Sequence, residues 1–500
     1  MIRLLAIAML VVAGPAAAQI PTAEYAARRD SVAVHLGDGV LLAYGAGDPM
    51  TDESDFHQLP SFEYLTGHRR VNAVFVMAMK SGKVTYQMLF EPPIDPRRAL
   101  YDGFPPDSAE LERRTGLGLR SNEHLRDVMD ALASRGTLWT VTDTHSRDYR
   151  TTDSLSAERT FVQRFWAAHP SVVVRSADPL LDSLMVVKSP AEIALLRKAV
   201  EISAQGEVAA MKAVHPGVNE GTIHALTDYT FRMEGASGPS FRAIIGSGPN
   251  STSYHYRAND RVMLSGEIVV MDMGALYDGY AGDVTRTIPV SGKYTADQAA
   301  IYAIVRAAQM AAEREAKPGA PVANGEKAIR AIMATELAKL GLTEGVDASF
   351  DPPWADAARC ERVPVVCSQA FIYMAHGPGH GIGLEVHDAG GYSYSPTGSF
   401  RLNEVFTIEP GVYISTALLD MLADTPKNRA FIAKVRPVVE RYNHTGIRIE
   451  DDYLVTADGV EWLSKAPREM KEIEAVMKAG ATARASTSGS AGGRASSGGK

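Results

Sequence analysis

Short apolar runs rich in β-branched residues recur through the first third of the chain. They lie at Gly39–Tyr44, Ala73–Ala78, Val84–Phe90, Leu138–Val141 and Val172–Val174. Runs of this length predict buried strands, and the segment Asn122–Ser134 between them is typical of a helix. The alternation predicts an N-terminal α/β domain over residues 19–178, and no catalytic cluster stands out in it.

The pattern changes near residue 189, where a long helix is predicted. Ser189 and Glu192 have the spacing of a capping box at its start. An apolar stripe follows at Ile193, Leu196 and Val200. Further helices are predicted at 219–234, 295–315 and 324–340, and strand-like arms at 242–245, 267–289, 404–409 and 446–455. Helices that alternate with antiparallel hairpins favour an α+β domain over residues 179–478.

Both ends of the chain depart from these patterns. Residues 1–18 combine a basic start, the apolar run Leu4–Gly14 and small residues up to Ala18. The run is too short to span a bilayer, so we expect a signal peptide that is cut after Ala18. The mature protein is then exported, periplasmic or secreted, without a membrane partner. Residues 479–500 are poor in apolar side chains and are predicted to be a disordered tail.

Composition narrows the class of protein. A chain of 500 residues with 45% hydrophobic and 22% charged residues is typical of a soluble globular protein with two domains. The net charge of −8 and the lack of a basic block argue against a nucleic-acid partner. Cys360 and Cys367 can form one small disulfide loop in an exported protein, and two unpaired thiols are the alternative. Two cysteines alone do not make a zinc site.

One predicted hairpin carries an aspartate in each arm, Asp272 and Asp283. If its turn centres on residues 277–278, the two aspartates face each other directly. If residues 278–279 form the turn, the register moves by two and both stay on one face. A three-residue bulged loop would separate them. Two carboxylates roughly 5 Å apart repel each other, and a bound cation removes the conflict.

A second cluster lies at Ala375–Asp388 and holds His376, His380 and His387. A lone histidine is usually structural, but three within so short a segment point to a site. Glycines alternate with them and let the backbone run close to crowded groups. A phosphate-binding loop is disfavoured because Pro378 and a histidine interrupt the glycine pattern.

Two further carboxylates end or follow predicted strands. Glu409 lies between an apolar strand and a Pro-Gly turn, while Arg448 and Glu450 share one strand face. The candidate metal ligands are Asp272, Asp283, His380, Glu409 and Glu450. Four carboxylates balance two divalent cations, and the oxygen-rich set suits Mn²⁺, with Co²⁺ or Zn²⁺ as alternatives. Two such ions roughly 3.5–4 Å apart can share a hydroxide and polarise a carbonyl.

Together these motifs resemble the pita-bread metallopeptidases, and within them the Xaa-Pro aminopeptidases and prolidases. The resemblance is carried by MDMG…GD, HGPGHGIGLEVHD, TIEPG and GIRIEDD over residues 180–478. SFEYLTG and EPPIDPRRALYDGF extend it into the first domain. It implies a creatinase/aminopeptidase P-like N-terminal α/β domain followed by a pita-bread catalytic domain. By analogy it also implies a homo-oligomer.

The resemblance implies a role for each metal ligand. Asp272 would chelate one metal ion, and His380 and Glu409 would hold the other. Asp283 and Glu450 would bridge the two ions. Glu409 would also act as the general base that activates the water between them.

The resemblance implies four further catalytic residues around the substrate. His255 would lie beside the scissile bond, and His376 would line the proline side of the cleft. His387 would contact the substrate and steady the intermediate. Arg448 would pair with the acidic network or with the distal end of the substrate.

The function implied is removal of the N-terminal residue before proline from peptides, with two divalent metal ions. An X-Pro bond has no N–H, so it favours a dedicated pocket for the ring. A prolidase acting only on Xaa-Pro dipeptides is the alternative, because Gly381-Ile382 fits that group equally well. A metal-free amidinohydrolase or binding module would lack ligands, and all five are present. The segments Cys360–Cys367 and Ser415–His444 are expected near the site.

Overall fold

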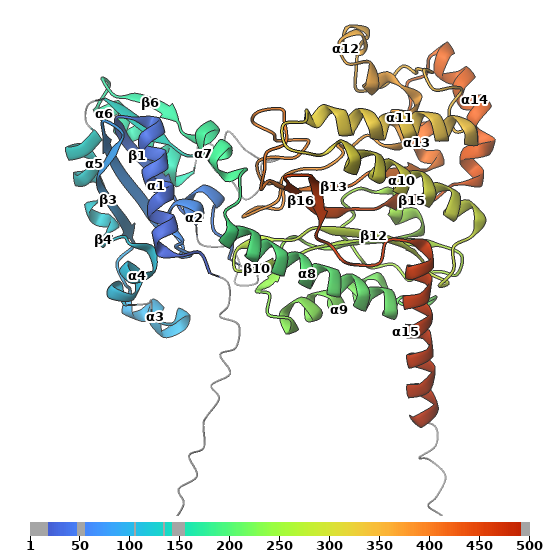
Figure 1. Ribbon diagram of the computed structural model, residues 1–500, viewed down its shortest axis with the longest axis horizontal. Coiled ribbons are helices and arrows are strands. Elements are labelled where there is room, and N and C mark those ends of the chain that lie inside the picture. Colours follow the sequence, from blue (N-terminus) through green and yellow to red (C-terminus); the bar gives the residue numbers. More distant parts are fainter. Residues whose placement is uncertain (1–18, 48–55, 105–106, 134–135, 143–155, 492–500) are drawn as a thin grey trace, which may run out of the picture.

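The computed structural model describes residues 19–47, 56–104, 107–133, 136–142 and 156–491 (Figure 1). The expected signal peptide, residues 1–18, lies outside the described residues. The chain forms two domains that follow one another in sequence, and α8 opens the second (Figure 1). The α/β and α+β character expected of the two domains is confirmed.

The first domain is built on a six-stranded mixed sheet in the order β4-β3-β2-β1-β5-β6. Its strands are β1 (Gly39–Tyr44), β2 (Val74–Lys80), β3 (Lys83–Glu91), β4 (Leu119–Ser121), β5 (Thr137–Thr140) and β6 (Val173–Ser176). β1, β2 and β3 are antiparallel neighbours, while β4, β5 and β6 each run parallel to the strand beside them. Five of these strands were predicted from their apolar runs, with ends shifted by a residue or two.

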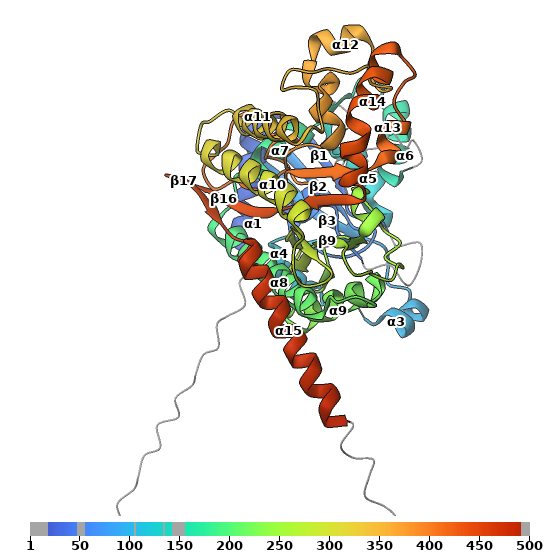
Figure 2. The ribbon, with the colours of Figure 1, turned by 90° about the vertical axis from the view of Figure 1, so that its right-hand side faces the viewer.

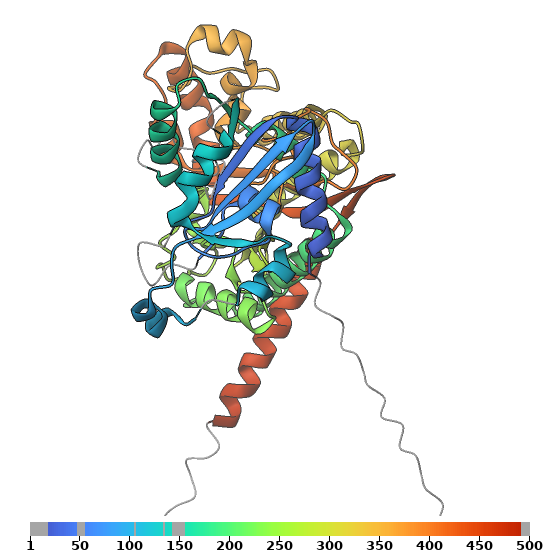
Figure 3. The same ribbon diagram turned by 90° about the vertical axis from the view of Figure 1, so that its left-hand side faces the viewer.

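Helices cover both faces of this sheet (Figures 1 and 3). One core contains side chains of α1 (Thr22–Leu36), α2 (Pro60–Thr66), α4 (Ser108–Thr115) and α7 (Asp178–Met185). The other contains those of α5 (Leu125–Ala133), which follows the turn η1 (Asn122–His124), and α6 (Ala157–Ala168). Leu41 faces the first core and Leu42 the second, as the period of a strand requires. The short helix α3 (Pro96–Asp102) lies beyond β3.

The predicted domain boundary needs a correction. Residue 178 was expected to end the first domain, but α7 begins there. Leu181 and Met185 of α7 are buried in the core beneath the sheet of the first domain. Apolar contact with that core therefore extends the first domain to the end of α7, and the second begins with the capped helix at Ser189. Both hydrogen bonds of its capping box are present.

Small antiparallel sheets form the centre of the second domain. The first sheet, in the order β12-β9-β8, contains β8 (Ile244–Ser247), β9 (Ile268–Met273) and β12 (Val284–Pro289). The second, in the order β13-β16-β17, contains β13 (Val405–Ile408), β16 (Asp451–Thr456) and β17 (Gly459–Trp462). The remaining strands are β7 (Gly238–Pro239), β10 (Ala275–Tyr277), β11 (Tyr280–Ala281), β14 (Gly411–Ile414) and β15 (Thr445–Arg448). An isolated β-bridge between Thr285 of β12 and Glu450, directly before β16, connects the first of these sheets to the second.

Helices pack outside these strands (Figure 1). On one side lie α8 (Pro190–Ala213) and α9 (Glu220–Met233), and on the other α10 (Ala296–Glu315) and α11 (Val322–Leu340). Other helical elements are η3 (Gly248–Thr252), α12 (Ala357–Arg362), η4 (Pro364–Cys367), η5 (Gln369–Tyr373), α13 (Thr416–Asp420), α14 (Pro426–Arg441) and α15 (Met470–Ala491). Cys360 and Cys367 form the expected disulfide, with Cα atoms 5.6 Å apart. Within the described ranges, no helix is long and apolar enough to cross a membrane.

The tail expected from residue 479 onward is wrong for residues 479–491. There α15 continues as a helix, and its Gly480 lies so close to Lys212 of α8 that no Cβ would fit (Figure 2). Alanine recurs through this stretch and is the best helix former, which offsets the small polar residues between. Low apolar content alone was therefore a poor guide. Residues 492–500 lie outside the described part of the chain.

Candidate metal centre

The hairpin adopts the second of the two expected registers. Asp278 and Gly279 form its turn with φ values of 46° and 83°, as a two-residue type I′ turn requires. Asp272 therefore pairs with Thr285 across β9 and β12. Asp283 lies two residues before that partner, diagonal to Asp272. The direct pairing expected from a turn at 277–278 is wrong, because the residue following Tyr277 adopts the left-handed conformation at the start of the turn.

All predicted site residues line one cavity of about 520 Å³. They are Asp272, Asp283, His380, Glu409, Glu450, His255, His376, His387 and Arg448. The hairpin supplies the first two, and the ends of β13 and β15 lead into Glu409 and Glu450. Neither Cys360–Cys367 nor Ser415–His444 contributes a described residue to the cavity wall, so the two expected additions leave it unchanged.

His380 lies among three carboxylates. Its Nε2 is 3.5 Å from Glu409 Oε1, 3.6 Å from Asp283 Oδ2 and 3.8 Å from Glu450 Oε1. Ligand atoms of Asp283, His380 and Glu450 lie within 4.8 Å of one another, and all three side chains are buried. A buried imidazole among carboxylates at such distances is a donor set for a divalent cation.

The electrostatics of the site fit the same conclusion. Asp272 Oδ1 and Asp283 Oδ1 are buried and accept no hydrogen bond from the described residues. Burial, with the charge of Glu450, raises the pKa of Asp283 well above its usual range. Burial, with the charge of Asp272, raises the pKa of Glu450 to about 8. Crowded buried carboxylates are unfavourable unless cations neutralise them, so the donor set fits two divalent ions.

Hydrogen bonds from neighbouring side chains orient the carboxylates of Glu450 and Asp272. Thr285 Oγ1 donates to Glu450 Oε2 over 2.7 Å and accepts from Arg448 Nε over 3.2 Å. Arg448 also donates to the carboxylate of Asp272 and to Tyr413 Oη, the latter over 2.7 Å. Its expected pairing with the acidic network is confirmed. Thr285 and Tyr413 were not predicted, although the hairpin register alone places Thr285 opposite Asp272.

Two histidines around the ligands, His255 and His376, are shifted toward their neutral form. Burial, with the charge of Arg448, lowers the pKa of His376 to about 3, and burial also lowers the pKa of His255. The ring centroid of His376 lies 5.1 Å from that of Tyr254 and 5.4 Å from that of Tyr413. His387 stands beside the ligands, 4.2 Å from His380 between ring centroids. Neutral rings can exchange hydrogen bonds with a peptide without adding charge.

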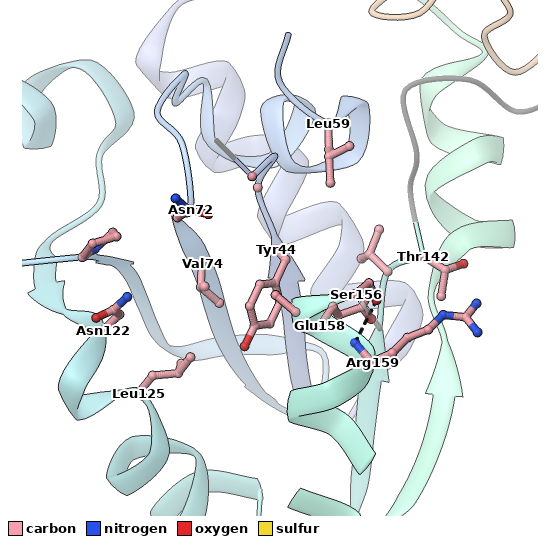
Figure 4. A pocket seen from close by; sticks show the side chains of 15 residues that line it. Tyr44, Leu59, Asn72, Val74, Asn122, Leu125, Thr142, Ser156, Glu158 and Arg159 are labelled. Atoms are coloured by element: carbon pink, nitrogen blue, oxygen red, sulfur yellow. Dashed lines mark hydrogen bonds between the residues drawn. The ribbon is translucent and has the colours of Figure 1, made fainter. Parts of the chain in front are cut away.

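A second cavity, of about 730 Å³, lies in the first domain (Figure 4). Tyr44, Asn72 and Asn122 are part of its wall, and the backbone N–H of Arg159 donates to Ser156 Oγ at the start of α6. No predicted site residue lines it. The chemistry expected from the sequence therefore gathers in the second domain alone.

Comparison with known proteins places the chain in a family. Residues 194–457 match the metallopeptidase family M24, and residues 25–139 match the N-terminal domain of aminopeptidase P. The chain belongs to metallopeptidase family M24. Members similar to it include the Xaa-Pro aminopeptidase of Escherichia coli, 29% identical over 92% of this chain and 99% of that protein. The human Xaa-Pro dipeptidase is 34% identical, over 60% of this chain and 61% of its own.

Solved aminopeptidase structures are similar to this chain over both domains. Zn-substituted E. coli aminopeptidase P in complex with product has a TM-score of 0.74 and 27% identity, covering 92% of this chain and 99% of its own. Pseudomonas aeruginosa aminopeptidase PepP also has a TM-score of 0.74 and 27% identity, covering 93% of this chain and 100% of its own. The expected pita-bread domain behind an aminopeptidase P-like domain is thereby confirmed.

Proposed function

We propose that this M24 protein is a dinuclear metal-dependent aminopeptidase that removes the N-terminal residue before proline. The observation that carries the proposal is the cluster of His380 with Asp283, Glu409 and Glu450, which shares one cavity with Asp272. In this cavity, one carboxylate oxygen each of Asp272 and Asp283 has no hydrogen-bond donor among the described residues. Relatives named Xaa-Pro aminopeptidase match over nearly their whole length, whereas the Xaa-Pro dipeptidase matches over 61% of its own. Both domains thus favour the aminopeptidase over the dipeptidase.

The five ligands Asp272, Asp283, His380, Glu409 and Glu450 would hold the ions. When bound, the ions supply a Lewis acid for the scissile carbonyl and a nucleophilic water at neutral pH. Glu409 would serve as the proton acceptor in that chemistry, because its carboxylate lines the cavity and is 18% exposed. His255, held neutral, can donate a hydrogen bond to the substrate beside the reacting bond.

An aromatic wall beside the ligands suits the proline ring. Tyr254 and His376 line the cavity with ring centroids 5.1 Å apart, and the buried ring of Tyr413 packs against both. Such a wall provides apolar area for a pyrrolidine ring, and it needs no N–H from the peptide bond before proline. Burial of the His376 ring would keep that wall uncharged as the substrate enters.

We further propose Mn²⁺ as the native metal, export from the cytoplasm and assembly as a homo-oligomer. The metal assignment is supported by the predominance of oxygen ligands, and Zn²⁺ or Co²⁺ would also bind such a set. Export is supported by the pattern of residues 1–18 and by the Cys360–Cys367 disulfide, since such bonds persist in oxidising compartments.

The test is hydrolysis of matched peptides by protein reconstituted with Mn²⁺. We expect release of the first residue from Xaa-Pro-Yaa and no release from Xaa-Ala-Yaa. Chelation of the metal should abolish turnover, and metal analysis should give two ions per chain. Turnover of Xaa-Pro dipeptides alone would favour the prolidase instead. Full activity of Glu409→Ala in protein without bound metal would refute a metallopeptidase.

A further inference from the structure

Two arginines on the wall of the metal cavity have no counter-charge. Arg242 and Arg257 both line the cavity and both are exposed. Among the described residues neither makes an ion pair or side-chain hydrogen bond. Most other arginines of the second domain, such as Arg261 with Glu267, are paired. An unpaired guanidinium facing a substrate cavity is free to bind an anion.

The two arginines lie on neighbouring segments of the cavity wall, and this part of the wall is called the rim below. The buried side chain of Asn259 connects their two segments, because its Nδ2 donates to the Ala243 carbonyl over 2.8 Å and its Oδ1 accepts from Ile245 N over 2.9 Å. Arg242 directly precedes Ala243, and Arg257 lies two residues before Asn259. The bond network therefore fixes the backbones that carry the two guanidinium groups next to each other.

The same rim borders the metal site. Ile244 pairs with Asp272 across β8 and β9, and Ile244 also lines the cavity. His255, which lies between the two arginine segments in sequence, lines the same cavity as Asp272 and Arg257. A peptide that reaches the ligands through this cavity thus passes within reach of the rim.

The positive charge of the two arginines favours an anionic ligand. Two divalent cations would neutralise the four carboxylates of the floor, which leaves the arginines as unbalanced charge at the mouth. Guanidinium groups prefer carboxylates, which they can bind through two parallel hydrogen bonds. A peptide offers carboxylates as acidic side chains or, in a short substrate, as its C-terminus.

We propose that Arg242 and Arg257 form a carboxylate-binding subsite that selects acidic or short peptides. The subsite rests on the proposed peptidase function and adds a preference to it. An acidic residue before proline and a C-terminal carboxylate share this chemistry, and the experiment separates them.

The test compares kcat/KM for peptide pairs with full-length, metal-loaded protein. Glu-Pro-Leu-amide against Gln-Pro-Leu-amide isolates the acidic side chain, and Gln-Pro-Leu with a free C-terminus against its amide isolates the terminal carboxylate. We expect the acidic member of at least one pair to be preferred by about fivefold, as for an ion pair at an exposed site. The preference should fall as salt is raised.

Variants assign the preference to the rim. Arg242→Ala with Arg257→Ala should bring the ratio within the responsive pair close to one, and the lysine variants should retain part of it. The ratio within one protein cancels any general loss of activity. Arg314→Ala, which removes an exposed arginine of α10 away from the cavity, should keep the wild-type ratio.

Two results would overturn the subsite. Equal kcat/KM within both pairs for the wild-type protein, with the neutral peptides turned over, would refute the subsite and leave the proposed function intact. A preference that the double variant retains would also refute it. Failure of metal-loaded protein to cleave any Xaa-Pro peptide would instead overturn both proposals together, since the subsite is defined on that reaction.

Discussion

The two ends of the β9–β12 hairpin place aspartates in opposite settings. At the metal end, the side chains of Asp272 and Asp283 are 11% and 6% exposed, and one oxygen of each lacks a donor in the described structure. At the turn, Asp278 is 37% exposed and its Oδ1 accepts from Arg69 Nη1 over 2.5 Å. Arg69 thus pairs with the turn aspartate, whereas the donor-free oxygens of Asp272 and Asp283 would be satisfied by bound cations.

The turn aspartate is held by a residue of the first domain, whereas the metal-end aspartates face the cavity of the second domain. Arg69 belongs to the first domain, donates also to the Asp278 carbonyl and is held by the buried carboxylate of Glu63. Gly279 has a φ of 83°, and a Cβ there would lie 2.4 Å from Glu63 Oε1, so a larger residue would strain the turn and displace this contact. The first domain therefore secures the turn that sets the register of the two metal ligands at the other end.

The largest effect is expected at the metal end, from Asp283→Asn. The amide keeps the shape but removes a charged ligand beside His380, so we expect at least about a hundredfold loss of kcat/KM and of metal affinity. In chelated protein the same change should raise the melting temperature, because one of several buried like charges is gone. Metal content by mass spectrometry and thermal denaturation measure the two effects.

Asp278→Asn is the matched control, at the satisfied end of the same hairpin. It should retain most of the activity and should not stabilise chelated protein, because Asp278 faces a cation and not another carboxylate. Unchanged metal content in Asp283→Asn would contradict the assignment of this aspartate as a ligand.

The pH dependence of stability should differ between chelated and metal-loaded protein. The folded-state pKa of Asp283 is raised, and that of Glu450 is raised from 4.5 to about 8. Chelated folded protein thus binds more protons than unfolded chain between these values, and its free energy of unfolding should fall as pH rises from 5 to 8. Metal binding keeps the carboxylates ionised and should remove or reverse this slope. Melting curves at several pH values, recorded with chelator and with Mn²⁺, measure this dependence. An equal change of stability with pH in both conditions would count against the metal site.

The aspartates at the metal end of the hairpin could be predicted from the sequence, whereas the contact at its turn could not. Asp272 and Asp283 were identified because carboxylates in apolar strands are out of place, and their motif matched a family. Two hairpin registers stayed open from the sequence, and the structure has the one in which Asp278 and Gly279, with positive φ, form the turn. The contact of Arg69 with Asp278 was not predicted, because it spans 209 residues and nothing in either local pattern signals the other.

A smaller effect is expected at the turn end, from Arg69→Ala. The change removes the donor to Asp278 and leaves the buried Glu63 without this partner, so we expect about a tenfold weaker affinity for Mn²⁺ and a loss of about 1–3 kcal/mol in stability. Titration of chelated protein with Mn²⁺ gives the affinity. Arg69→Lys should recover part of it, which a purely local unfolding would not predict.

Arg70→Ala serves as the neighbouring control, since Arg70 pairs with Glu91 inside the first domain. It should change stability without changing the affinity for Mn²⁺. If both variants weakened metal binding equally, the effect would belong to the first domain in general, and the special role of the turn contact would be lost.

The smallest effect is expected from Tyr280→Phe, one residue past the turn. The Tyr280 hydroxyl donates to Glu192 Oε1 over 3.0 Å, but Glu192 also accepts from Ser189 N over 2.8 Å and pairs with Arg28 at 3.2 Å. Loss of one of three partners, with the ring still packed, should lower the free energy of unfolding by about 1 kcal/mol. Urea denaturation of metal-loaded protein measures it. The affinity for Mn²⁺ should not change, because the ring and the register remain. If Tyr280→Phe weakened Mn²⁺ binding as much as Arg69→Ala, any contact near the turn would affect the metal affinity. The Arg69–Asp278 pair would then have no special role.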